Sequence, residues 1–156
     1  NKSHSLSEPD SGLAERFEDC TFLFAKVVGL KKLTELTETQ ASNQVADPVD
    51  PAVIVNILQL IFDRFDALAD TFKVQKIRKT VNEYYMVAAG LPDPLRIPDP
   101  KERTLAIAAL AFSMVQVMDV INSEPELKNL NIQLQAQIGI HSGTAIAGII
   151  GHKRFQ

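Results

Sequence analysis

Apolar side chains recur at helical spacing between residues 51 and 72, and strand-like apolar runs lie on both sides of this segment. Asp50 and Pro51 form a good N-cap and first-turn pair at its start. The apolar positions fall on one face of the predicted helix: Ile54, Ile57, Leu58, Ile61, Phe65, Leu68 and Phe72. A helix with one apolar face must pack that face on another element, so this segment predicts a layered domain.

Strand patterns flank the helix. Residues 21–28 are rich in Phe and Val and predict a buried strand. Residues 74–78 and 83–89 predict a hairpin whose turn lies near residues 79–82. The following segment, residues 90–100, holds four prolines and is expected to be irregular.

The second half of the chain predicts another helix and further strands. Residues 101–122 are apolar nearly all round in their middle, so we expect this helix to be well buried. Residues 133–141 alternate between apolar and polar side chains, which predicts a strand with one face on the helices and a polar face free for a cleft or a partner. A final short strand is expected at residues 144–150, after a turn at Ser142 and Gly143.

The resulting order is strand, helix, strand, strand, helix, strand, strand. This order predicts an α/β fold of the α+β type, with a ferredoxin-like βαββαβ plan and an extra strand. We expect an antiparallel sheet covered by helices on one face. Residues 1–18 are polar and predict a flexible lead-in, and residues 19–156 predict the domain itself.

Composition excludes several classes of protein. The net charge is −3, so there is no general basic field for nucleic acid. The single cysteine, Cys20, cannot form an internal disulfide, which fits a reducing compartment. No uninterrupted apolar run approaches the roughly 20 residues of a spanning helix, and no signal peptide is evident. We therefore expect a soluble domain without direct membrane insertion, although it could be cut from a membrane protein.

Lys26 is the one charge within the first predicted strand, T-F-L-F-A-K-V-V. A buried ammonium group without a partner costs several kcal/mol, about enough to offset much of the strand's burial. Lys26 must therefore have a partner or a route to water.

Three segments resemble the class III adenylate and guanylate cyclase catalytic domain. They are F-L-F-A-K-V-V-G-L at residues 22–30, N-E-Y-Y-M-V-A-A-G-L-P at 82–92, and I-G-I-H-S-G-T-A-I-A-G-I-I-G at 138–151. They occur in the family's order, and the third is the most specific. The resemblance implies a cyclase homology domain that pairs head-to-tail with a second one, as a homodimer or a heterodimer, around ATP or GTP.

In that family two aspartates on neighbouring strands hold divalent cations, Mg²⁺ or Mn²⁺. The matching positions are Lys26 and Glu83. An ammonium group cannot ligate a cation, whereas Glu83 remains a weak candidate ligand. Lys26 and Glu83 could instead form an ion pair, or Lys26 could extend to the sheet edge with Glu83 solvated. On either interpretation the resemblance implies that the partner half holds the metal.

The resemblance also implies nucleotide-binding residues. The family holds the triphosphate with backbone amides after the first strand, at positions matching Val27, Val28, Gly29, Leu30 and Lys31. By the same resemblance Lys31 and Lys32 could contact phosphate, but solvated helix lysines are the simpler interpretation.

Purine recognition falls on the strand that precedes the hairpin turn. The family reads the purine with a Lys or Glu on this strand. Because the strand is one residue longer here than in the family, either Arg78 or Lys79 could match that position. Both residues are basic, whereas the family reads guanine with a glutamate, so this position does not favour GTP. The choice between ATP and GTP stays open.

The resemblance implies one half of a cyclase active site, converting GTP or ATP to the 3′,5′-cyclic nucleotide and pyrophosphate. The sequence ends at Gln156, before the family's W-G-D-x-V-N-x-A-x-R segment, whose Asn and Arg act on ribose and phosphates. We therefore expect the isolated chain to be inactive, with no catalytic residue in this fragment. The alternative is a pseudo-cyclase domain that acts as a regulatory or dimerisation module. Both functions fit a cytoplasmic domain, either free or part of a membrane-anchored protein.

Overall fold

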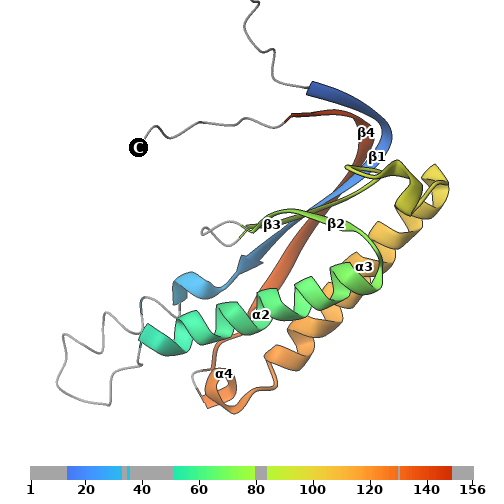
Figure 1. Ribbon diagram of the computed structural model, residues 1–156. Helices are drawn as coiled ribbons and strands as arrows, with labels where there is room; N and C mark the ends of the chain where they lie inside the picture. The colour runs from blue at the N-terminus through green and yellow to red at the C-terminus, as the bar shows by residue number, and fades with distance from the viewer. Residues whose placement is uncertain (1–13, 33–34, 36–50, 80–83, 130, 149–156) are drawn as a thin grey trace, which may run out of the picture.

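The computed structural model describes residues 14–32, 35, 51–79, 84–129 and 131–148, and the statements below concern these residues. They form four strands and three helices, with one 3₁₀ turn (Figure 1). In chain order the elements are β1 (Ala14–Val28), α2 (Pro51–Thr71), β2 (Gln75–Lys79), β3 (Tyr84–Ala89), η1 (Pro94–Arg96), α3 (Pro100–Ile121), α4 (Pro125–Asn129) and β4 (Gln135–Gly148).

The strands form one antiparallel sheet in the order β2-β3-β1-β4. The long helices α2 and α3 lie across the same face of this sheet (Figure 1). The predicted α+β class, with an antiparallel sheet and helices on one face, is confirmed. The hairpin of β2 and β3 is also confirmed, although most of its turn, residues 80–83, lies outside the described residues.

The core lies between the sheet and the two helices. The predicted apolar face of α2 packs there, with Ile61 and Phe65 fully buried. Phe62 and Phe65 contact the ring of Tyr85 on β3, at centroid distances of 6.1 and 5.5 Å. Because aromatic rings bury large areas, this cluster is a main contact between α2 and the sheet.

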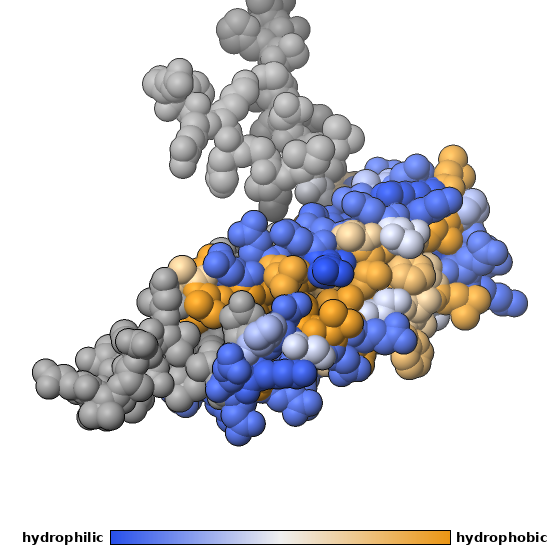
Figure 2. All heavy atoms as spheres, turned by 90° about the horizontal axis from the view of Figure 1, so that it is seen from below, coloured by the Kyte–Doolittle hydropathy of each residue, from blue (hydrophilic) through white to orange (hydrophobic). Residues whose placement is uncertain are grey.

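α3 is less buried than its composition predicts. Ile107, Leu110, Met114 and Met118 face the core, but a second apolar stripe faces outward: Leu105, Phe112, Val115 and Val120. Figure 2, which views the molecule from below, shows apolar side chains exposed among polar ones. The prediction that this helix is well buried is wrong, because the sheet covers only one side of it. By length and hydropathy α3 would also suit a membrane span, but its inward stripe packs in the core of this domain.

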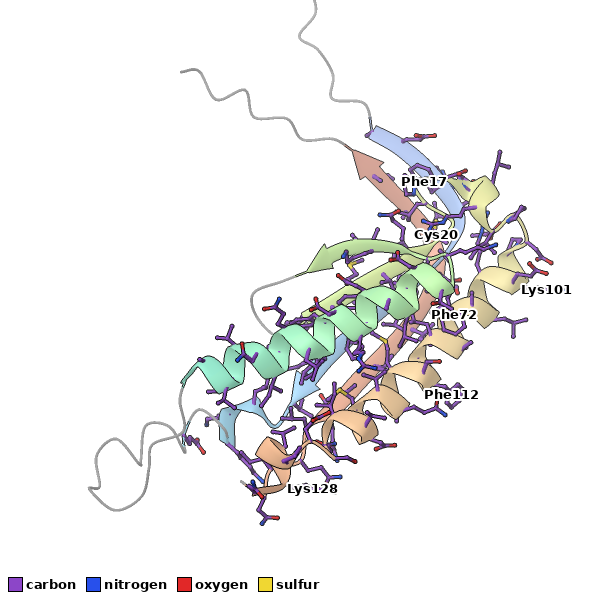
Figure 3. All side chains as sticks on the ribbon, turned by 60° about the horizontal axis from the view of Figure 1, so that its bottom comes forward. Phe17, Cys20, Phe72, Lys101, Phe112 and Lys128 are labelled. Carbon is purple, nitrogen blue, oxygen red and sulfur yellow. The ribbon has the colours of Figure 1, made fainter. Side chains whose placement is uncertain are left out.

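β1 begins at Ala14, earlier than predicted. Residues 14–17, which fall within the expected flexible lead-in, pair with β4, and residues 1–13 lie outside the described residues. A bulge between Phe17 and Cys20, with Asp19 at φ 53°, places both side chains in a small second cluster with Ala88 and Leu91 (Figure 3). Burial of these apolar groups explains why the strand extends into a polar stretch.

β4 is one continuous strand rather than two. The predicted turn at Ser142 and Gly143 is wrong, because both residues lie within Gln135–Gly148 and pair with Thr21 and Cys20 of β1. Serine followed by glycine is typical of a turn, but pairing with the long strand β1 holds this segment extended.

Candidate functional site

The sheet face opposite the helices is the candidate site. Successive side chains of a strand point to opposite faces, so Leu23, Ala25 and Val27 of β1 enter the core. The alternate residues face away from the helices: Phe22, Phe24, Lys26 and Val28. We call this surface, with its neighbours on β3 and β4, the open face.

Lys26 lies on the open face, two residues before the end of β1. It is opposite Tyr84 on β3 and Gln137 on β4. Its Nζ lies 5.4 Å from the centroid of the Tyr84 ring, within the range of a cation–π contact. Its side chain is only partly buried. The ammonium group therefore has both an aromatic neighbour and access to water, which resolves the energetic problem that its strand position raises.

Glu83 lies outside the described residues, so the Lys26–Glu83 ion pair stays a prediction. Glu83 directly precedes Tyr84, which is the β3 residue opposite Lys26. The strand of Lys26 is therefore paired with β3, the strand that begins directly after Glu83. The contact with the Tyr84 ring was not predicted, because the resemblance makes the two strands neighbours but does not indicate which side chain lies over Lys26.

The row beside Lys26 is apolar. Phe24, 48% exposed, lies between Met86 of β3 and Gly139 of β4. A Cβ atom at Gly139 would meet nothing within 4 Å, so the surface is open beside Phe24. An exposed phenylalanine next to open space suits a contact with another protein surface.

The turn after β1 has the backbone geometry that its sequence suggests. Gly29 has φ 103°, and a Cβ atom there would lie 2.7 Å from the carbonyl oxygen of Gln133, so only glycine fits. Val27 and Leu30 are buried in the core. These two predicted nucleotide-binding residues can therefore offer only backbone atoms. The side chain of Lys31 points to Glu35, with 3.5 Å between Nζ and Oε1.

A pocket of about 640 Å³ lies beside this turn. β1 and the helical turn after it contribute Val28, Gly29 and Lys32. The other wall comes from the segment between α3 and β4: Asn122, Leu127, Lys128, Asn131, Ile132, Gln133 and Gln135. The residue patterns did not single out Lys128, because nothing in a sequence places α4 beside Gly29.

The predicted purine-reading residues lie on β2. Arg78 and Lys79 pair through their backbones with Met86 and Tyr85 of β3. A register shift between Lys76 and Arg78 marks a bulge or irregularity in the pairing of β2 with β3. Their side chains lie outside what the structure describes, so their role stays a prediction.

The described residues do not fit a divalent-cation site. The ammonium group of Lys26 is positively charged and has no acceptor, so it cannot ligate a cation. Among the described residues, no three or more His, Cys, Asp or Glu side chains are grouped to hold a metal ion. His141 is exposed on β4, and Cys20 is buried with its thiol 3.7 Å from the Gly90 carbonyl oxygen.

Comparison with known proteins identifies the family of this chain. The model of the adenylate and guanylate cyclase catalytic domain matches residues 13–156. The chain therefore belongs to this family.

Individual relatives agree. The soluble guanylate cyclase subunit beta-2 of Rattus norvegicus is 29% identical over 151 residues, which are 97% of this chain and 19% of that protein. A receptor-type guanylate cyclase of Caenorhabditis elegans is 30% identical over 142 residues, 90% of this chain and 9% of that protein. The chain thus spans a fifth or less of these two relatives.

Solved structures share the fold. The adenylyl cyclase CyaB of P. aeruginosa superposes with a TM-score of 0.72 at 18% identity, over 90% of this chain and 63% of that one. A dimeric guanylyl cyclase domain from the fungus Blastocladiella emersonii gives 0.66 at 18% identity, over 92% and 67%.

Proposed function

We propose that this chain is one half of a composite cyclase active site that converts GTP or ATP to the 3′,5′-cyclic nucleotide and pyrophosphate. The residue that carries the proposal is Lys26, which lies on the open face of a cyclase fold, at the position that the sequence resemblance matches to a metal-binding aspartate. A half with this lysine binds and positions the nucleotide, and a second cyclase domain holds Mg²⁺ or Mn²⁺.

The chain's own residues have three tasks in this proposal. The positive φ of Gly29 lets the chain turn directly after β1. In this turn the backbone at Gly29 and Leu30 faces the phosphates. Phe24 and Tyr84, each about half exposed, contact the partner domain. Lys26 supplies a fixed positive charge between them, which favours negative charge on the nucleotide or the partner.

The substrate and the cellular setting follow the relatives only as proposals. The relatives named above are guanylate cyclases, one soluble and one receptor-type, which supports GTP and a cytoplasmic catalytic domain. ATP remains the second candidate, because Arg78 and Lys79 do not match the family's guanine-reading glutamate.

A cyclase assay on mixed domains tests the proposal. The full-length domain, extended through the family's segment with Asn and Arg, should be inactive alone with ATP or GTP and Mn²⁺. Adding a homologous cyclase domain that carries both aspartates should give more cyclic nucleotide than that partner makes by itself. The control is the same partner with one aspartate changed to Asn, which should abolish the activity of the mixture. Activity of the purified chain alone would sink the half-site proposal.

Restoring the carboxylates is the companion experiment. The variant Lys26→Asp with Glu83→Asp should bind Mn²⁺ when paired, measured by the paramagnetic broadening of its NMR signals. Undetectable Mn²⁺ binding would mean that these positions do not match the family's aspartates.

The second candidate function is a regulatory or dimerisation module. The exposed apolar row around Phe24 favours it, because that surface serves pairing whether or not chemistry follows. A mixture that forms a stable pair by analytical ultracentrifugation but produces no cyclic nucleotide would favour this function.

A further inference from the structure

We propose that Lys26 selects the partner of this domain. Its charge opposes pairing of the open face with a second copy of the chain and favours a cyclase domain whose open face carries carboxylates. This deepens the proposed function and rests on it, because it takes the open face as the surface that meets the partner. It also decides between the homodimer and the heterodimer, which the resemblance leaves open.

The sheet brings no carboxylate to the open face beside Lys26. The described strands β2, β3 and β4 contain no aspartate or glutamate. The acidic residues of β1 are Glu15, Glu18 and Asp19, all near the other end of the strand. Asp19, the nearest of them in sequence, is roughly 20 Å away along an extended strand. The described strands therefore give this face a positive charge at Lys26 without an anion next to it.

The neighbours of Lys26 suit a contact surface. Tyr84, whose ring centroid lies 5.4 Å from Nζ, is 49% exposed, and Phe24 on the same face of β1 is 48% exposed. Aromatic side chains supply much of the contact area of protein interfaces, so a partner that covers these two rings also covers Lys26. The ring contact offsets only part of the cost of removing an ammonium group from water.

Pairing with a second copy imposes this cost twice. A two-fold dimer buries the same patch of both copies, so both Lys26 ammonium groups would be covered by strands that offer no carboxylate near them. Positive charges on the two faces would also repel each other. A partner with aspartates on its open face presents the opposite charge. Lys26 thus discriminates against the second copy as well as favouring the other partner.

Glu83 is the acidic residue that could cancel this discrimination. It directly precedes Tyr84 in the sequence and lies outside the described residues. An ion pair within the chain would leave Lys26 with no charge to present to a partner. Removing the charge of Lys26 would then have no effect on self-association, so variants of Lys26 separate the two cases.

Analytical ultracentrifugation of the full-length domain tests the proposal, in EDTA so that the partner's carboxylates are free of metal. We expect Lys26→Gln to tighten self-association at least about tenfold, and to weaken pairing with a homologous domain that carries both aspartates about tenfold. Rising salt should weaken the mixed pair of the wild type more than that of Lys26→Gln, because salt screens charge and leaves packing unchanged.

Two control variants match this experiment. Lys26→Arg keeps the charge at the same position and should pair as the wild type does. Lys101→Gln removes the charge of an exposed lysine at the start of α3, away from the open face (Figure 3), and should leave both affinities unchanged. Lys26 is only partly buried, so each variant should fold, as circular dichroism can verify.

Two outcomes would overturn the proposal. Self-association of Lys26→Gln that is no tighter than that of the wild type would show that the charge does not oppose a second copy. An unchanged mixed pair would show that the partner does not respond to the charge. A mixture that pairs selectively through Lys26 but makes no cyclic nucleotide would instead reject the proposed catalytic half and leave the selection of the partner standing.

Discussion

Arg103 is a buried guanidinium group whose hydrogen-bond partners are backbone carbonyl oxygens. It is 5% exposed, and its Nε donates to Ile97 at 2.7 Å. The other nitrogens reach four further carbonyl oxygens: Asp19 at 3.1 Å, Pro94 at 3.0 Å, Glu18 at 3.3 Å and Pro98 at 3.4 Å. One side chain thus joins the β1 bulge, the proline-rich segment and α3, which a planar fork of donors can do and a lysine cannot.

Replacing this side chain should be costly. We expect Arg103→Met to lower the free energy of unfolding by about 3 kcal/mol, because it leaves buried carbonyl groups without donors. Urea denaturation measures the change. The matched variant Arg96→Met, at an exposed arginine, should stay within about 0.5 kcal/mol of wild type. Equal effects of the two would show that the carbonyl contacts contribute nothing.

Tyr85 connects the sheet to α2 through a charged acceptor. Its hydroxyl donates to Asp66 Oδ1 at 2.9 Å, and Lys76 pairs with the other carboxylate oxygen at 2.6 Å. Burial, and then the hydrogen bond to Asp66, raise the pKa of Tyr85 well above its usual value. The neutral phenol is therefore the form that the folded state favours.

This gives a stability change with a defined pH dependence. We expect Tyr85→Phe to cost about 1.5 kcal/mol at pH 7, the usual value for a hydrogen bond to a charged group. The unfolded tyrosine ionises near pH 10, so the wild type should lose stability above that pH, by up to about 1.4 kcal/mol per pH unit from this group. The phenylalanine variant lacks this loss, so the gap between the two should shrink above pH 10. A gap that stays constant in denaturation from pH 7 to 11 would contradict the raised pKa.

At the scale of elements, α3 presents two apolar faces with different environments. Leu110 is fully buried under the sheet, whereas Leu105 is 67% exposed on the same helix. We expect Leu110→Ala to destabilise the domain by about 2–5 kcal/mol, because it leaves a cavity. The matched Leu105→Ala should cost less than about 0.5 kcal/mol. Thermal and urea denaturation would measure both. A large loss of stability in Leu105→Ala would mean that the outward apolar stripe is covered in the folded protein.

At the scale of the whole molecule, the sheet is well supported in its middle and weakly supported at one end. β3 pairs with β1 only from Thr21 to Lys26, whereas the stretch Ala14–Phe17 pairs with β4 alone. A two-stranded ribbon with a small apolar cluster has little independent stability. We expect amide hydrogen exchange at Ala14–Phe17 to be at least about 100-fold faster than at Leu23–Val27. Uniform protection along β1, measured by NMR, would show that the small cluster stabilises the ribbon as well as the main core does.

Local patterns predicted the parts of the fold that local forces decide. The single apolar face of α2, the hairpin and the irregular proline-rich segment all follow from side-chain spacing and backbone chemistry, and the structure agrees with them. The cyclase motifs likewise pointed to the right family, because they lie within continuous segments. The Ser142–Gly143 turn failed for the opposite reason, since pairing with a distant strand overrode a local preference.

The sequence by itself determined the α+β class and the family, and its motifs predict a lysine where the family has a metal ligand. Only the tertiary structure decided what surrounds that lysine. Strand pairing brings the Tyr84 ring over Lys26, and packing brings α4 and Lys128 beside Gly29. Both contacts join residues more than 50 positions apart, and such contacts depend on the register and packing of the whole sheet, which no local pattern encodes.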